Sequence, residues 1–325
     1  MNLLVTYDAD ADQRAIIDEG LRGVYEVAYL ADVADRAQGL RDADVILSWN
    51  PPREIAPDEY PLLSRLRLMQ LFSAGGDHVP SELFARGFDI AGNVGAYARP
   101  MAEHVLALTL ALAKDLKGNY LKLKAGEFDQ FSMNRSIEGS TVAILGFGGI
   151  GKAAAHLFQA FGARILGINT SGRTEEKVDF IGTLADLETV LRQADIIVIS
   201  LALSKVTEGL IGERELGWTK PDAILVNVAR GEIIDERAFF EHLKAHPGFR
   251  AGIDAWWVEP FRHGKFELTY PFLDLPNVIG TPHDSGMVPG ALTHATKVVV
   301  ARLRDYAAGE PIKGLLQKDD YVEGK

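Results

Sequence analysis

Three residues whose side chains suit acid–base chemistry and anion binding each follow an apolar run in the second half of the chain. Arg230 comes after the run at 224–228, Glu259 after the run at 250–253, and His283 after the short run at 278–279. Such runs are typical of buried strands, and parallel strands bring their carboxyl ends to one edge of a sheet, where ligands bind. We therefore expect these three side chains at one edge.

The three side chains together suit a hydride-transfer reaction. Oxidation of an alcohol to a ketone needs a base for the hydroxyl proton, reduction needs the same group as an acid, and the imidazole of His283 can serve both. The Glu259 carboxylate would orient that ring and favour its protonated form. The Arg230 guanidinium can grip an anionic substrate through two N–H donors. Taken singly, the residues are as well explained as a surface ion pair, a solvated loop acid and a capping side chain, but their combination favours catalysis.

A glycine-rich turn earlier in the chain predicts a dinucleotide site. The apolar run 141–145 leads directly into the turn, and a helical segment begins at Lys152. In this context Gly146 allows a tight turn, Gly148 lets the backbone approach a pyrophosphate, and Gly151 lets helix and strand pack closely. A plain strand-to-helix turn is the alternative. The expected cofactor-binding residues of the turn are Gly146, Phe147, Gly148, Gly149, Ile150 and Gly151.

The next strand, at 164–168, predicts which nicotinamide cofactor is used. It ends at Asn169, where NAD-selective folds place a carboxylate that binds the ribose 2′-hydroxyl and repels a 2′-phosphate. Thr170 and Ser171 offer hydroxyl groups and Arg173 offers charged donors, which together could hold that phosphate. We expect NADP(H) to be preferred, with NAD(H) possible. The alternatives are dual specificity, or a polar turn with Arg173 in solvent.

The order of apolar runs predicts an α/β protein with two Rossmann-like, doubly wound parallel-sheet domains and a cleft between them. Residues 1–98 plus 289–325 would form a split substrate domain, and 99–288 the dinucleotide-binding domain. A helix is expected from Pro100 to about Lys117, and another after Pro289. Because the later strands are almost continuously apolar, helices should cover both faces of their sheet. The expected strands lie at 3–5, 25–28, 45–49, 68–72, 142–145, 164–168, 196–200, 224–228, 250–253 and 278–279.

Composition excludes several classes of function. The 325-residue chain has no cysteine, so it has no disulfide, thiolate metal site or cysteine nucleophile. Its net charge of −11 disfavours nucleic acid as a partner. The N-terminus does not resemble a secretory signal and no apolar run is long enough to cross a membrane, so we expect a cytoplasmic protein without membrane contact.

A few other residues have open interpretations. His242 and His246 are four residues apart on a helical stretch, but we expect no metal and interpret them as solvated cations favoured by the helix dipole. Trp49, Tyr97 and Arg99 could touch substrate or merely pack, and packing is the first interpretation for Trp49.

Over nearly its whole length the chain resembles the D-isomer-specific 2-hydroxyacid dehydrogenase family, which includes glyoxylate/hydroxypyruvate reductases. The resemblance is carried by the turn from Gly146 and by the segments 73–77, 227–235, 254–260 and 281–283. It implies that Arg230 binds the substrate carboxylate, that His283 is the acid/base with Glu259 as its partner, and that the protein is a homodimer acting on a small 2-oxo or 2-hydroxy acid. By the same resemblance, the backbone N–H groups of Ala74, Gly75 and Gly76 hold the substrate carboxylate and Asp254 holds the nicotinamide carboxamide. Further cofactor contacts are expected at Leu201, Ala202, Val228 and Ala229.

The chain departs from the family pattern at three places. Asn169 replaces an acidic residue, Ala202 stands where Pro is frequent on the adenine side, and Trp256–Trp257 replaces a smaller pair that could reshape the pocket. Two alternatives stay open: a phosphite dehydrogenase-like oxidoreductase, and a nucleotide-sensing, corepressor-like binding protein. Formate dehydrogenase is disfavoured, because that branch has Gln in place of Glu259. The pattern does not select one 2-oxo acid.

Overall fold

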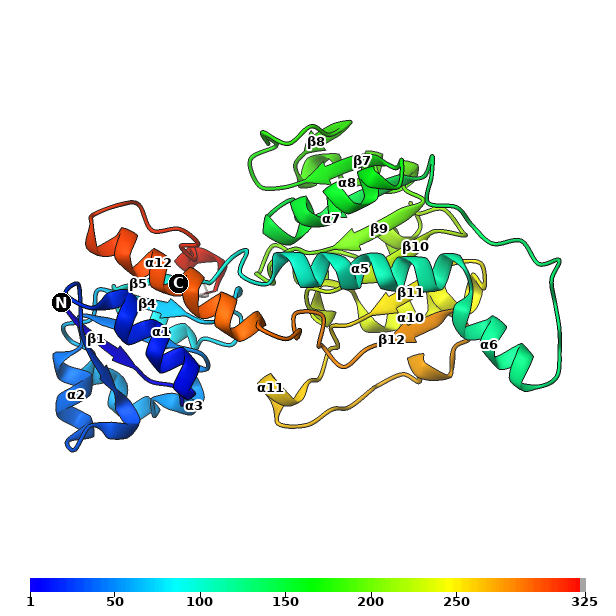
Figure 1. Cartoon of the computed structure of the whole chain (residues 1–325). Helices are drawn as coiled ribbons and strands as arrows, with labels where there is room; N and C mark the ends of the chain where they lie inside the picture. Colours follow the sequence, from blue (N-terminus) through cyan, green and yellow to red (C-terminus); the bar gives the residue numbers. More distant parts are fainter. Residues whose placement is uncertain (322–325) are drawn as a thin grey trace. The chain divides into compact units, whose positions relative to one another are not determined.

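The computed structural model describes residues 1–321, which form two units, each built around its own parallel sheet (Figure 1). Unit 1 comprises Met1–Tyr97 and the C-terminal segment from Val288, and unit 2 comprises Ala98–Met287. In both units the strands alternate with helices along the chain. The predicted α/β class with two doubly wound parallel sheets is therefore confirmed.

The sheet of unit 1 has five strands in the order β2-β1-β3-β4-β5, all parallel. The chain order reverses between β1 and β3, as in doubly wound folds, so loops at the carboxyl ends of β1, β3 and β4 meet beside that point. The strands are β1 (Asn2–Val5), β2 (Glu26–Tyr29), β3 (Val45–Ser48), β4 (Leu68–Leu71) and β5 (Asp89–Ala91).

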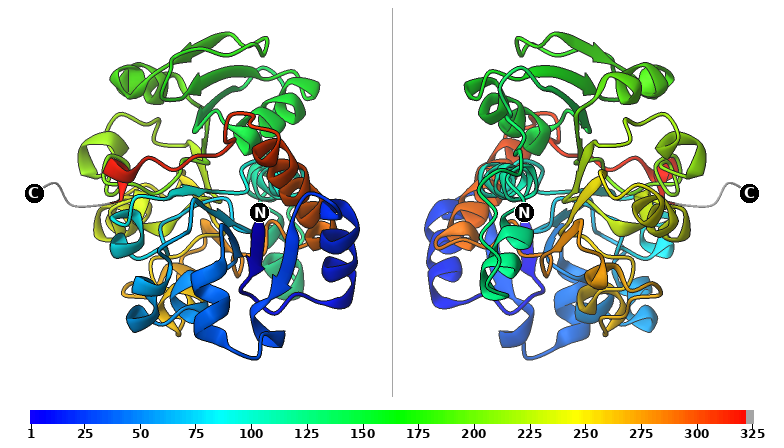
Figure 2. Two further views of the ribbon diagram at one scale, coloured as in Figure 1. Left: turned by 90° about the vertical axis from the view of Figure 1, so that its left-hand side faces the viewer. Right: turned by 90° about the vertical axis from the view of Figure 1, so that its right-hand side faces the viewer.

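Helices from both ends of the chain cover the sheet of unit 1. The C-terminal helix α12 (Ala291–Ala307) lies beside α1 (Ala11–Leu21), as both views of Figure 2 show. Gly20 permits this close packing, because a Cβ atom there would lie 2.4 Å from the Val300 side chain. The shorter helices are α2 (Arg36–Asp42), α3 (Pro51–Glu54) and α4 (Ser81–Phe84).

The sheet of unit 2 has seven parallel strands in the order β12-β11-β10-β9-β6-β7-β8. Its chain order reverses between β6 and β9, the position at which dinucleotides bind in such sheets. The strands are β6 (Thr141–Leu145), β7 (Arg164–Ile168), β8 (Phe180–Gly182), β9 (Ile196–Ile199), β10 (Ile224–Asn227), β11 (Arg250–Ile253) and β12 (Val278–Gly280).

Both faces of this second sheet are buried, as the apolar runs predict. Successive residues of a strand point to opposite faces. Ile144 and Val226 accordingly pack beneath α5 (Ala98–Ala113) and α7 (Gly149–Ala160), whereas Leu225 packs beneath α8 (Leu187–Gln193) and α10 (Glu236–Ala245). Three shorter helices, α6 (Leu116–Lys124), α9 (Glu213–Leu216) and α11 (Pro260–His263), complete the unit.

Three elements of the structure differ from those that the sequence predicted. The three-residue strands β5 and β8 were not predicted, because so short a run carries no clear alternation. The single helix expected from Pro100 to about Lys117 is two helices. Asp115 adopts the left-handed conformation (φ 47°) and ends α5, after which the chain starts α6.

Candidate active site

Three neighbouring strands deliver the predicted catalytic residues to one edge of the sheet in unit 2. β11 lies between β10 and β12, and the register pairs Asn227 with Ile253 and Ile253 with Gly280. The three strands therefore end level with one another. Arg230, Glu259 and His283 all lie in the segments that follow these ends, as the sequence analysis expected.

His283 and Glu259 form a direct pair. The His283 Nδ1 atom lies 2.8 Å from Oε1 and 2.7 Å from Oε2 of Glu259. The glutamate side chain is only 9% exposed, and the backbone N–H of Trp256 donates a 2.6 Å hydrogen bond to its Oε1. An ionised carboxylate only accepts hydrogen bonds, so it holds the ring tautomer that carries a proton on Nδ1. The opposite nitrogen, Nε2, is then the one that can exchange a proton with a ligand.

Arg230 follows β10, the strand next to β11, and is held by contacts within its own loop. The Asn227 side chain receives the N–H of Ala229 at 3.0 Å and donates to the Arg230 carbonyl at 2.8 Å. The guanidinium donates a 2.7 Å hydrogen bond to the Ala229 carbonyl. Gly231 brings this loop against the segment after β11, because a Cβ atom there would lie 2.5 Å from the Trp256–Trp257 backbone. Asn227 and Gly231 had no expected role, although both hold the loop that carries Arg230.

The backbone of His283 is strained. Its φ of 55° lies in the left-handed region, which costs a residue with a side chain about 1 to 3 kcal/mol. The flanking residues are tied to the fully buried Asp254: Thr281 Oγ1 donates to its Oδ1 at 2.6 Å, the Asp284 N–H to Oδ1 at 3.2 Å, and the Ser285 N–H to Oδ2 at 3.3 Å. These bonds hold the loop around His283. The contact of Asp254 with a carboxamide stays a prediction.

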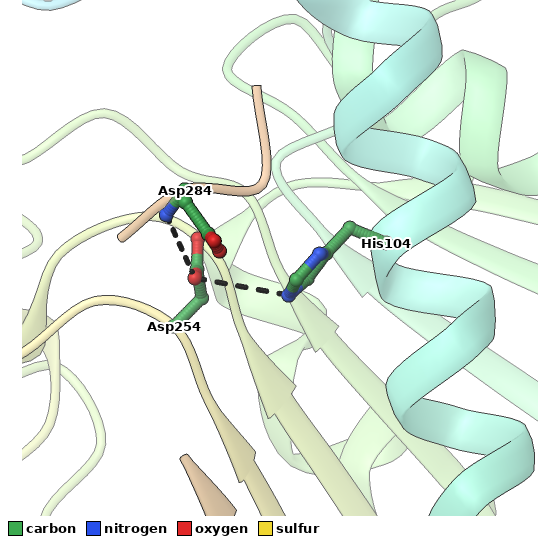
Figure 3. Close-up of side chains that lie close together, drawn as sticks. All are labelled: His104, Asp254 and Asp284. Carbon is green, nitrogen blue, oxygen red and sulfur yellow. Dashed lines mark hydrogen bonds and ion pairs between the residues drawn. The ribbon is translucent and has the colours of Figure 1, made fainter. Parts of the chain in front are cut away.

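His104 on α5 extends this group of polar side chains. Figure 3 shows its ring directed at the Asp254 carboxylate, with Asp284 next to that carboxylate. The His104 Nε2 atom lies 3.1 Å from Thr281 Oγ1 and 3.7 Å from Asp254 Oδ1. The contact between His104 and the Thr281 side chain was not expected from the sequence. The two residues are 177 positions apart, and a histidine inside an apolar helix carries no local signal of such a partner.

The two adjacent tryptophans serve the packing of unit 2. The indole N–H of Trp256 donates a 2.8 Å hydrogen bond to the Thr281 carbonyl, which joins the loops after β11 and β12. Trp257 stacks on Phe272, with ring centroids 5.1 Å apart, and donates to the Ile234 carbonyl. Both side chains therefore stabilise the segment that follows β11.

The glycine turn fits a dinucleotide pyrophosphate. Gly146 adopts φ 102°, and a Cβ atom there would lie 2.5 Å from the Leu201 nitrogen; a Cβ atom on Gly151 would lie 2.3 Å from the Gly146 carbonyl oxygen. Around Gly148, by contrast, a Cβ atom would meet nothing within 4 Å. The exposed Gly148 precedes α7, whose first N–H groups have no partner within the helix and can bind phosphate oxygens.

Other predicted cofactor residues border the same region. Leu201 and Ala202 follow β9, next to β6, and Val228 and Ala229 follow β10. The Ser200 hydroxyl, just before them, donates a 2.8 Å hydrogen bond to the Gly146 carbonyl and joins the two loops. The end of β9 is thus tied to the glycine turn at the point where the strand order reverses.

The loop after β7 is shaped by Asn169. Its Oδ1 receives the backbone N–H groups of Ser171 at 3.1 Å and Gly172 at 2.7 Å, and its amide donates to the Arg173 carbonyl at 2.9 Å. Thr170, Ser171 and Arg173 are exposed. The strand therefore ends without a carboxylate, and the turn that follows it exposes Arg173 to solvent.

The predicted carboxylate-binding loop lies in unit 1. Ala74, Gly75 and Gly76 follow β4 in an irregular segment, and Gly76 packs so tightly that a Cβ atom there would lie 2.3 Å from the Leu316 side chain. The Ser73 hydroxyl donates to the Gly75 carbonyl at 3.1 Å. These bonds and contacts fix the loop at the carboxyl edge of its sheet.

Of the three residues left open, Trp49 packs against aromatic neighbours, as first interpreted. Its ring centroid lies 4.9 Å from that of Phe72 and 5.8 Å from that of Tyr7. Tyr97 is partly buried, and its burial raises the pKa of its hydroxyl. The Arg99 side chain is 90% exposed and pairs with Glu103 at 3.3 Å.

The interpretation of His242 as a solvated cation is wrong. Burial lowers the pKa of His242 to about 4, with a smaller contribution from nearby His246. The two rings lie 4.2 Å apart, and Phe249 meets His242 edge-on at 4.7 Å. His242 is therefore a neutral packing residue near neutral pH, because α10 turns its ring inward.

Among the described residues, no helix is long and apolar enough to cross a membrane.

Comparisons with known proteins agree with this geometry. A family model described as the NAD-binding domain of D-isomer specific 2-hydroxyacid dehydrogenases matches residues 106–285, more than half of the chain. A glyoxylate reductase of Thermococcus gammatolerans is 29% identical over 86% of this chain and 84% of its own. A glyoxylate/hydroxypyruvate reductase B of Enterobacter agglomerans is 32% identical over 74% of this chain and 73% of its own.

Solved structures extend the similarity to the whole chain. A provisionally named formate dehydrogenase of Pyrobaculum aerophilum is 28% identical, covers 99% of this chain and 100% of its own, and superposes with a TM-score of 0.83. A D-isomer specific 2-hydroxyacid dehydrogenase family protein of Aeromonas salmonicida is 25% identical, covers 98% and 99%, and has a TM-score of 0.78. This chain is an oxidoreductase that belongs to the D-isomer-specific 2-hydroxyacid dehydrogenase family.

Proposed function

We propose that the protein reduces a small 2-oxo acid of the glyoxylate or hydroxypyruvate type to the corresponding 2-hydroxy acid, the D isomer where the product is chiral, with NADPH as the preferred reductant. The observation that carries the proposal is the His283–Glu259 pair at the end of the strands that also present Arg230. The relatives named glyoxylate reductase and glyoxylate/hydroxypyruvate reductase B support this substrate class.

A nicotinamide cofactor held by the glycine turn from Gly146 would supply the hydride that the carbonyl carbon of the substrate takes up. His283, held by Glu259 through Nδ1, gives the proton on Nε2 to the carbonyl oxygen, which becomes the hydroxyl. Arg230 binds the substrate carboxylate with two parallel N–H donors. In the reverse direction His283 removes the hydroxyl proton. Glu259 stabilises the positively charged ring that is present whenever both nitrogens of His283 carry a proton.

The loop after β7 supports the choice of NADPH. The Asn169 side chain presents no negative charge at the end of β7, and Arg173 is exposed beside it. Glu176, which would weaken a positive site nearby, is paired with His156 at 2.8 Å and lies 3.9 Å from Lys152. A 2′-phosphate would therefore meet the Arg173 cation with no carboxylate at the strand end itself, while the exposed Glu175 two residues further along weakens the local positive field.

An apolar surface on unit 2 supports the proposed homodimer. Helix α6 and the segment after it lie at the end of the unit remote from β8 (Figure 1). Several large apolar side chains there are more than half exposed, which is typical of a surface that binds a partner. They are Leu116, Tyr120, Leu121, Leu123, Phe128, Phe131 and Met133.

The test of the oligomeric state is light scattering on the purified protein. We expect twice the chain mass for the wild type and a single chain mass for Phe131→Ser combined with Met133→Ser. A monomeric wild type would exclude the homodimer.

The test of the activity is a panel of glyoxylate, hydroxypyruvate, pyruvate and a bulkier 2-oxo acid, each assayed with NADPH and with NADH by the loss of nicotinamide absorbance. Turnover with a small 2-oxo acid is expected. Oxidation of phosphite or formate without 2-oxo acid turnover would reject the proposal in favour of another dehydrogenase. Tight cofactor binding without any turnover would favour a nucleotide-sensing protein.

A further inference from the structure

The cluster of His104, Asp254 and Asp284 lies outside the reactive pair, and of its three members only Asp254 has a predicted role, the contact with the nicotinamide carboxamide. One ligand atom from each residue lies within 4.8 Å of the others, as in a divalent metal site. The oxygens of Asp254, however, already receive hydrogen bonds from Thr281 Oγ1 and from the N–H groups of Asp284 and Ser285. Three hydrogen bonds therefore occupy three of the roughly four lone-pair sites of this carboxylate, so the arrangement fits a hydrogen-bonded cluster better than a metal site.

The hydrogen-bond chemistry fixes the direction of the chain of contacts. The Thr281 hydroxyl, 2.6 Å from Asp254 Oδ1, gives its only hydrogen to that carboxylate. Its oxygen can then only accept from His104 Nε2, at 3.1 Å. The direct distance from His104 Nε2 to Asp254 Oδ1 is 3.7 Å, beyond hydrogen-bond range, so the connection runs through the hydroxyl.

The hydrogen bonds of Asp254 hold the chain on both sides of His283. Asp254 binds the loop two residues before His283, at Thr281, and again directly after it, at Asp284 and Ser285. His283 has φ 55°, a conformation that residues with side chains adopt only where the surrounding contacts impose it. The carboxylate therefore brackets the one strained residue of the loop.

We propose that His104 is a positioning residue for the reaction, which through Thr281 and Asp254 holds the loop that keeps His283 on Glu259. The inference rests on the proposed role of His283 as acid/base. His104 is anchored on the long helix α5, which packs against the sheet, so it provides a rigid reference for a loop that has no regular structure of its own. Loss of its donor should loosen the loop and misplace His283, without removing any group that touches the substrate.

The first test is nitrogen-15 NMR of the histidine rings in the wild-type protein, with His104→Gln used to assign the His104 signals. We expect a proton on Nε2 of His104. A bare Nε2 would overturn the proposal, because Thr281 would then have no donor. This measurement needs no turnover, so it remains decisive if the proposed activity is not found.

The second test compares variants in steady-state 2-oxo acid reduction. His104→Leu should lower kcat about tenfold while KM for the oxo acid and Kd for the cofactor change by less than about threefold, because only the alignment of His283 is lost. His104→Gln, whose amide nitrogen can take the place of Nε2–H, should recover most of the loss. His294→Leu, which removes an exposed imidazole on α12, is the matched control.

Thr281 supplies the independent check if His104→Leu folds poorly by thermal melting. Thr281→Ser keeps the hydroxyl and should stay close to wild type in kcat, whereas Thr281→Val should lose at least as much as His104→Leu. The double variant His104→Leu/Thr281→Val should be no slower than Thr281→Val alone, since both act on one path. Fully additive losses, equal losses in His104→Gln and His104→Leu, or a wild-type kcat in His104→Leu would each overturn the proposal.

Discussion

The Nδ1 atom of His283 lies within 2.8 Å of both carboxylate oxygens of Glu259, although the two residues come from loops after different strands. The carboxylate is nearly buried, whereas a third of the His283 side chain is exposed. The Glu259 end of the pair is therefore buried and fixed, whereas the His283 ring is accessible from solvent. This polarity is what a proton-transfer group needs, because one nitrogen is oriented while the other meets the substrate.

His283→Gln should lower kcat for 2-oxo acid reduction by about two orders of magnitude, because the amide cannot donate and recover a proton. Cofactor binding, measured by the quenching of tryptophan fluorescence, should stay near the wild-type value. His283→Ala should behave alike. A kcat near that of the wild type in either variant would remove His283 from the reaction.

Glu259→Gln should shift the dependence of kcat on pH rather than abolish turnover. The amide can still accept the Trp256 N–H, so the loop is kept, but the ring loses the anion that favours its protonated form. We expect the pH optimum for reduction to move to lower pH. Glu267→Gln removes an exposed carboxylate and is the control. If both variants keep the wild-type profile, Glu259 does not act on the ring.

Arg230→Lys should damage catalysis strongly despite the retained charge. An ammonium group cannot form the two parallel bonds that a planar guanidinium gives a carboxylate. We expect a higher KM and a lower kcat, with kcat/KM down by about a hundredfold. Arg237→Lys, on the exposed side of α10, should match the wild type. Unchanged constants in Arg230→Lys would exclude the proposed grip on the substrate.

Asn169→Asp should turn the cofactor preference toward NADH. The new carboxylate can accept the same N–H groups of Ser171 and Gly172, but it loses the bond to the Arg173 carbonyl, and a negative charge returns to the strand end. Arg173→Ala should lower kcat/KM for NADPH and leave NADH nearly unaffected. Arg164→Ala, at the opposite end of β7, is the control. A wild type that prefers NADH, or an Arg173→Ala enzyme with intact NADPH efficiency, would contradict the proposed preference.

His242→Phe should make unit 2 less sensitive to acid. The pKa of His242 is lowered from 6.5 to about 4 in the folded chain, so the unfolded chain binds more protons between these values. The contribution of neutral His242 to the free energy of unfolding is therefore complete above about pH 6.5 and is lost as the pH falls toward 4. A fully buried group would lose about 3 kcal/mol, and about half is expected here because the ring is partly exposed.

Thermal melting at several pH values between 4 and 7 measures this effect. The difference in Tm between wild type and His242→Phe should change across this range in favour of the variant, whereas His294→Phe should give a constant difference. Parallel curves for wild type and His242→Phe would show that His242 does not lose its proton on folding.

Much of the candidate site was determined by the sequence alone, since its residues follow short apolar runs whose length and spacing are typical of buried strands. Arg230, Glu259 and His283 each stand within six residues of the end of such a run, and the glycines from Gly146 stand between a strand and a helix. Local patterning fixes which segments are strands, and the parallel arrangement then puts their carboxyl ends at one edge.

Only the tertiary structure decided how these residues are held. His104 is separated from Thr281 by 177 positions, and their hydrogen bond depends on how α5 packs on the sheet. The left-handed backbone of His283 and the inward orientation of His242 likewise follow from long-range packing. A local sequence pattern records the periodicity of an element, but it does not record which side chains from distant elements share one buried space.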